Sequence, residues 1–95
     1  MAVLTVTQLA RYLKGLLGQD SLLEDVWITG EVSSFTRAQS GHAYFTLKDG
    51  DSQLRCVMFR SSSGSGLLVQ GSQLLAHGHI SFYEPRGTVD FIVDI

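Results

Sequence analysis

Along the chain, apolar residues first recur at helical spacing and then, beyond residue 25, at every second position. Such a change of period predicts a helix followed by strands. The helical stretch covers residues 5–18, and its apolar stripe holds Leu9, Tyr12, Leu13, Leu16 and Leu17. Thr5 and Gln8 fit a capping box, and Gly18 is a natural helix stop. We therefore expect an amphipathic helix whose stripe packs against the rest of the domain.

Alternating apolar and polar residues predict five strands after residue 25. Their sequences are VWITGEVSSF, HAYFTLK, QLRCVMF, QLLAHGHISFY and TVDFIVDI. Gly30 in the first strand predicts a bulge or sharp bend, which would let one long strand pair with two neighbours. The Asp-Gly pair in "DGDS" predicts a tight hairpin between the second and third strands. Pro85 in "EPRG" predicts a turn between the last two strands.

These elements predict a mainly β fold, a five-stranded OB-fold Greek-key barrel preceded by an N-terminal α-helix. We expect a single domain over residues 1–95, with the helix at 5–18 and the barrel at 25–95. The last strand is expected to run to the final residue, which suggests a fragment of a longer chain. The Ser- and Gly-rich segment "RSSSGSGLLVQGS" is expected to be mobile in its first half.

The two strands of the predicted hairpin place different kinds of residue on their two faces. Ala43, Phe45 and Leu47 in one strand, and Leu54, Cys56 and Met58 in the other, are expected to point into the barrel. The opposite face carries rings, a hydroxyl group and cations, namely His42, Tyr44, Thr46, Lys48, Arg55 and Phe59. OB-folds bind oligonucleotides or oligosaccharides across this face. Aromatic rings stack bases and cations contact phosphates, but the two aromatic residues could equally stabilise cross-strand pairs.

The overall charge changes this picture only partly. A net charge of -2 over 95 residues argues against strong binding to nucleic acid. Arg37, Lys48, Arg55 and Arg60 nevertheless lie together in the middle of the chain, so one face could be basic. The single Cys56 excludes an internal disulfide, and no apolar run reaches the roughly 18 residues of a membrane span. With no recognisable signal peptide, we expect a soluble cytoplasmic protein without a membrane partner.

Several segments carry a more specific resemblance, in order and over nearly the whole chain: LTVTQLARYLKGLL, DVWITGEVSSF, SGHAYFTLKD, LRCVMFR and GHISFYEPRG. They resemble the N-terminal domain of the exodeoxyribonuclease VII large subunit. The resemblance implies a single-stranded DNA-binding module of a nuclease that degrades single-stranded DNA to oligonucleotides. It also implies assembly with the small subunit of that enzyme and a catalytic domain outside this chain. The DNA contacts that it implies are Arg37, His42, Tyr44, Lys48, Arg55, Phe59, Arg60, Tyr83 and Arg86.

No catalytic residues, cofactor or metal site are predicted in this chain. His77 and His79 share one strand face while Cys56 points inward, and such a set does not make a four-ligand zinc site. Asp49 and Asp51 flank a glycine and are typical turn formers. The resembling family tends to have arginine at positions 77 and 79. Protonation of these histidines below about pH 6.5 is therefore predicted to tighten DNA binding.

Two other functions remain open from the sequence. "YFTLKD" also resembles the anticodon-binding domain of some aminoacyl-tRNA synthetases, which would make the chain an RNA-binding OB domain. The third possibility is a protein-interaction domain that uses the helix stripe or the edge of the last strand.

Overall fold

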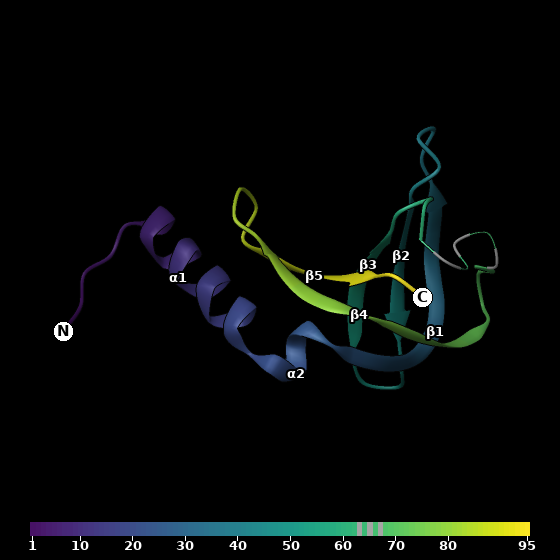
Figure 1. Ribbon diagram of the computed structural model, residues 1–95, viewed down its shortest axis with the longest axis horizontal. Coiled ribbons are helices and arrows are strands. Elements are labelled where there is room, and N and C mark those ends of the chain that lie inside the picture. Colours follow the sequence, from purple (N-terminus) through teal and green to yellow (C-terminus); the bar gives the residue numbers. More distant parts are fainter. Residues whose placement is uncertain (63, 65, 67) are drawn as a thin grey trace.

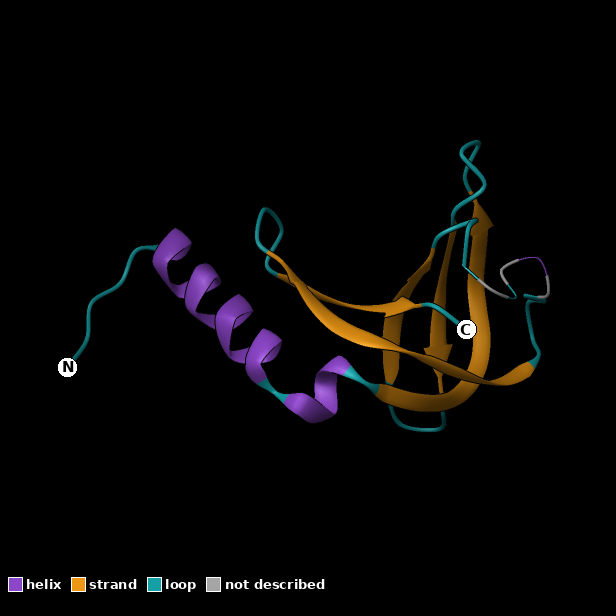
Figure 2. Ribbon diagram, viewed as in Figure 1, coloured by secondary structure: helices purple, strands orange, loops and turns teal. Residues whose placement is uncertain are grey.

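The structure, a computed structural model, describes residues 1–62, 64, 66 and 68–95. Figures 1 and 2 show a helical arm that leads into a curved sheet. The helices are α1 (Val6–Gln19) and α2 (Ser21–Glu24), and the strands are β1 (Val26–Arg37), β2 (Ala43–Lys48), β3 (Gln53–Met58), β4 (Gln73–Tyr83) and β5 (Thr88–Val93).

The strands close into a barrel in the order β1-β2-β3-β5-β4. Strand β3 runs parallel to β5, and every other pair of neighbours is antiparallel. This confirms the predicted helix followed by a five-stranded barrel. The barrel begins at Val26 and its last strand ends at Val93, so the expectation of a strand that reaches the final residue was wrong. Asp94 still donates its backbone N–H to the His77 carbonyl, at 2.9 Å.

Strand β1 belongs to both sides of the barrel, as its length and its glycine predicted. Its first half pairs with β4, and its second half, from Glu31 onward, pairs with β2. Figure 1 shows that β1 is sharply curved. At Gly30 a Cβ atom would lie 3.1 Å from the carbonyl oxygen of Lys48, so the close approach of β2 favours a residue without a side chain. The bulge itself lies further on, at Ser34, whose φ of 49° is left-handed.

The barrel interior holds one apolar core, made of Val32, Ala43, Phe45, Leu47, Cys56, Met58, Ala76, Phe91 and Val93. The inward residues predicted for β2 are all buried, which confirms the alternation there. In β3 the prediction holds for Cys56 and Met58, whereas Leu54 at the strand's start is only half-buried. Burial raises the pKa of the Cys56 thiol to about 12, so this side chain is a core residue and not a reactive thiolate.

Helix α1 starts as the sequence predicted. Thr5 Oγ1 accepts a hydrogen bond from the Gln8 backbone N–H at 3.1 Å, and Gln8 Oε1 accepts one from the Thr5 N–H at 2.8 Å. The predicted stop at Gly18 was wrong, because the helix includes that glycine and ends at Gln19. The carboxylate of Asp20 then accepts hydrogen bonds from two backbone N–H groups of α2 and starts a second, short helix.

Most of the apolar stripe of α1 is not covered by the barrel, contrary to the expectation from the sequence, although Leu17 is half-buried. Leu9, Tyr12 and Leu16 are 47%, 61% and 48% exposed, and Ala10 is the buried residue of this helix. The arm lies beside the far end of β4, where Lys14 Nζ is 3.8 Å from Glu84 Oε1. The barrel offers α1 a narrow strip of one strand, which is too little surface to cover the whole stripe.

Within the described residues, no helix has both the length and the apolar character that crossing a membrane requires. The first half of the link between β3 and β4, predicted to be mobile, includes residues 63 and 65, which lie outside the described part of the chain.

Candidate nucleic-acid interface

A groove of about 460 Å³ lies on the outer face of β3 and β5, beside the turn that joins β4 to β5. Five of the side chains predicted to contact DNA line it together: Tyr44, Arg55, Phe59, Tyr83 and Arg86. They come from two hairpins, since β2 pairs with β3 and β4 pairs with β5. Three rings and two guanidinium groups therefore converge although they lie far apart in the sequence.

The groove continues past Tyr44 and Arg55 into a second hollow of about 250 Å³. Its further outward side chains are Ser34, Thr36 and Thr46, which come from β1 and β2. The bulge at Ser34 lies at this hollow. Tyr44, 43% exposed, thus lies at the junction of two adjoining spaces on one face of the barrel.

Three further predicted contacts gather at the loop between β1 and β2. Arg37 Nη1 donates a hydrogen bond to the Gly41 carbonyl at 2.9 Å. The His42 Nδ1 accepts the Arg60 backbone N–H at 3.0 Å, which fixes the ring and gives it a structural role in this loop. The edge of that ring meets the Phe59 ring at a centroid distance of 5.0 Å. Phe59 therefore joins this loop cluster to the groove.

Lys48 lies away from these groups. It closes β2 next to the turn before β3, and its Nζ is 3.7 Å from Glu31 Oε2. Lys48 lines hollows at that turn, but it lines neither the groove nor the second hollow beside Tyr44. The turn itself is held by Asp49, whose carboxylate accepts two backbone N–H groups at 2.9 Å, as expected of a turn former. These hydrogen bonds lower the pKa of that carboxyl.

One groove residue, Asp90, was missed by the sequence reasoning. Its Oδ1 is 3.3 Å from Arg55 Nε, and its side chain is 14% exposed. It also lines the groove, so an anionic group lies among the rings and guanidinium groups. The alternation in β5 carries the signal that could have found it, because Asp90 lies one position before the inward Phe91 and so on the outward face of the strand.

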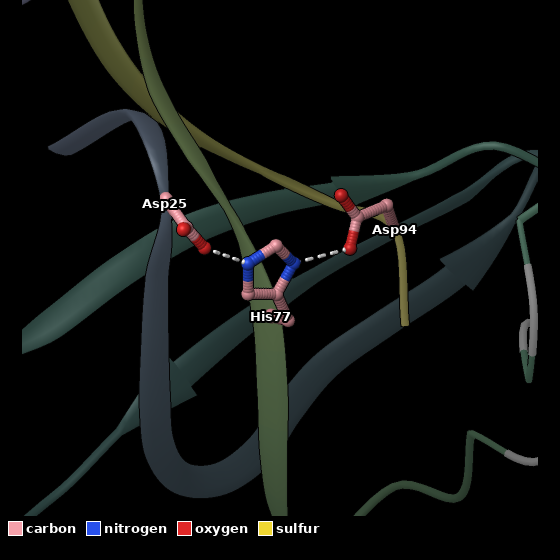
Figure 3. A network of polar contacts seen from close by, with 3 residues as sticks. All are labelled: Asp25, His77 and Asp94. Carbon is pink, nitrogen blue, oxygen red and sulfur yellow. Dashed lines mark hydrogen bonds and ion pairs between the residues drawn. The ribbon is translucent and has the colours of Figure 1, made fainter. Parts of the chain in front are cut away.

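A second polar network lies outside the groove and surrounds His77 (Figure 3). Its Nδ1 is 2.7 Å from Asp94 Oδ1, and its Nε2 contacts Asp25 Oδ1. Asp25 precedes β1 and Asp94 follows β5, so one imidazole on β4 ties together both ends of the barrel. The hydrogen bond to Asp25 is the larger cause, and the one to Asp94 the next, of a raised pKa of His77. A protonated His77 thus donates one N–H to each of the two carboxylates.

The raised pKa predicts how stability depends on pH. Because the folded protein holds the His77 proton more tightly than the unfolded chain, this group stabilises the fold fully below about pH 6.5. The contribution is lost as the pH rises through the higher pKa of the folded state. We expect the urea midpoint of the wild type to fall over this range, and His77→Gln to remove that part of the pH dependence.

Urea unfolding followed by circular dichroism, from about pH 5.5 to about pH 8.5, would measure this dependence. His79→Gln is the matched control and is expected to keep the wild-type slope. Equal slopes in the wild type and His77→Gln would contradict the assignment of this network.

Among residues 1–62, 64, 66 and 68–95, no three His, Cys, Asp or Glu side chains are arranged to hold a metal ion.

Comparison with known proteins is consistent with this arrangement. A family model described as an OB-fold nucleic acid binding domain matches residues 4–95. The chain is 44% identical over 94 residues to the exodeoxyribonuclease 7 large subunit of Geotalea uraniireducens (strain Rf4), covering 97% of this chain and 21% of that protein. The match is to the N-terminal part of that subunit, so the chain spans about a fifth of the length of such relatives.

Solved structures with this fold include an asparaginyl-tRNA synthetase from Pyrococcus horikoshii, with a TM-score of 0.62 and 16% identity over 77% of this chain and 19% of that one. The SSB domain of a protein from Synechococcus sp. has a TM-score of 0.56 and 10% identity, over 79% of this chain and 94% of that one. At these identities the likeness establishes the fold alone, and it confirms the predicted OB-fold.

Proposed function

We propose, from the premise that the chain belongs to the family of OB-fold nucleic acid binding domains, that it binds single-stranded DNA. The observation that carries the proposal is the groove in which Tyr44, Phe59 and Tyr83 lie beside Arg55 and Arg86. Rings stack on bases of any sequence, and guanidinium groups contact phosphates. A duplex hides the faces of its bases in its own stack, so a groove of this kind favours a single strand.

The wider setting of this binding activity follows from the relatives. The chain matches about a fifth of the length of exodeoxyribonuclease 7 large subunits. We infer that it is one domain of such a subunit, that it presents single-stranded DNA to a nuclease domain elsewhere in the protein, and that the protein assembles with a small subunit. The catalytic residues would belong to the remaining part of that protein, and the enzyme would work in the cytoplasm.

Fluorescence anisotropy with three labelled ligands would test the DNA-binding proposal. The ligands are a mixed-sequence single-stranded DNA, the RNA of the same sequence and the corresponding DNA duplex. We expect the single DNA strand to bind most tightly, with an affinity that falls steeply as salt is raised.

Each other outcome has a defined meaning. Tighter binding to RNA would favour the RNA-binding alternative. Binding to none of the three ligands would overturn the proposal. It would favour the alternative of a protein-interaction domain that uses the exposed face of α1.

A further inference from the structure

Asp90 is an acidic residue in a groove that otherwise suits a polyanion. Its carboxylate lines the same space as Tyr44, Phe59 and Tyr83. A carboxylate at this position repels phosphate groups, so a bound strand would not lay its backbone across it. The backbone would run along the rim, and the bases would face the groove.

Two side-chain oxygen atoms of β5 are buried without a hydrogen-bond partner among the described residues. Asp90 Oδ1 is buried and has no hydrogen-bond partner among the described residues, although Arg55 Nε lies 3.3 Å away as an ion-pair partner. Thr88 Oγ1, two residues earlier on the same strand, is also buried without a partner within the described chain. Buried polar atoms are normally hydrogen-bonded, so the carboxylate of Asp90, the one of these two residues that lines the groove, is suited to a ligand that brings a donor.

Arg55 can turn toward another anion because its own side chain is 55% exposed, whereas that of Asp90 is 14% exposed. A largely buried carboxylate without a partner is costly, so Arg55 leaves Asp90 only where a ligand supplies a replacement donor. A phosphate at the rim competes for this guanidinium group, and the Asp90 carboxylate then needs a new donor. The exocyclic amino group of a stacked base supplies one, as in the pairing of acidic side chains with cytosine N4.

We propose that Asp90 reads the base stacked in the groove and selects one with an exocyclic amino group, with cytosine favoured over uracil or thymine. Cytosine presents its N4 amino group, whereas uracil presents a carbonyl oxygen at the same position, which a carboxylate repels. This inference rests on the proposed binding of single-stranded DNA and adds a base preference to it.

The test compares oligo-deoxycytidine with oligo-deoxyuridine by anisotropy at neutral to slightly alkaline pH. The two bases have similar rings and differ chiefly in the groups on their hydrogen-bonding edge. We expect the wild type to prefer deoxycytidine by about tenfold, the size of one charge-assisted hydrogen bond. Asp90→Asn is expected to lose the preference, because an amide can accept from one base and donate to the other. Asp51→Asn, which makes the same charge change at the exposed β2–β3 turn, should keep it.

A second measurement leaves the protein unaltered, should Asp90→Asn fold poorly. An oligonucleotide of N4,N4-dimethyl-deoxycytidine has no amino donor and is expected to bind the wild type no better than oligo-deoxyuridine. Equal affinity of the wild type for oligo-deoxycytidine and oligo-deoxyuridine would overturn the base preference and leave DNA binding intact. Binding of neither would overturn the proposed function as well.

Discussion

Replacing Phe91 with alanine is expected to lower the free energy of unfolding by about 3–5 kcal/mol, the usual cost of emptying a buried aromatic site. Phe91 is 0% exposed and is among the largest fully buried side chains of the chain. It lies on β5, which pairs with both β3 and β4, so its ring is central to the closed barrel. Native domains are stable by about 5–15 kcal/mol in total, so the variant would lose a large share of that stability.

Urea unfolding followed by circular dichroism would measure the loss. Phe59→Ala is the matched control, because it removes the same ring from a residue that is 43% exposed, and its midpoint is expected to change far less. A Phe91→Ala variant with the midpoint of the wild type would contradict the position of this side chain at the centre of the core.

Replacing Tyr44 and Phe59 together with alanine is expected to weaken binding of single-stranded DNA by at least about thirtyfold, since each stacked base is worth about 1–3 kcal/mol. Both rings are 43% exposed and line the groove, Tyr44 from β2 and Phe59 from the position directly after β3. Because they are outside the core, their loss should leave the fold intact.

Anisotropy titration with mixed-sequence single-stranded DNA would measure the effect, with circular dichroism to verify folding. Tyr12→Ala removes an exposed ring from α1, away from the groove, and is expected to bind as the wild type does. An unchanged affinity of the double variant would remove both rings from the binding site.

The barrel was predictable because its pairing is partly local. Strands β2 and β3 are joined by a short turn, and every inward residue predicted for β2 is buried. The alternation alone therefore fixed which side chains would face outward. It also placed Tyr44 and Arg55 on a common face, and the structure adds Tyr83 and Arg86 from a second hairpin to the same groove.

What escaped prediction depends on contacts between distant segments. The periodicity of α1 showed that Leu9 and Leu16 share a face, but not that the barrel would leave that face uncovered. The bonds of His77 to Asp25 and Asp94 join residues that are brought together only by barrel closure. Lys48 was predicted to belong with the groove because it shares a face of β2 with Tyr44. It is the last residue of β2, however, and lies at the turn to β3, away from the groove.

The parallel pairing of β3 with β5 has a consequence for biosynthesis. Four residues of β3, from Arg55 to Met58, pair with β2 on one edge and find their partners on the other edge in Asp90–Val93, which are synthesised after the other strands of the barrel. A nascent chain that ends before β5 has an open sheet, an unpaired edge on β3 and half a groove. On the ribosome, folding and the ability to hold a ligand should therefore arise in one late step, when β5 leaves the exit tunnel.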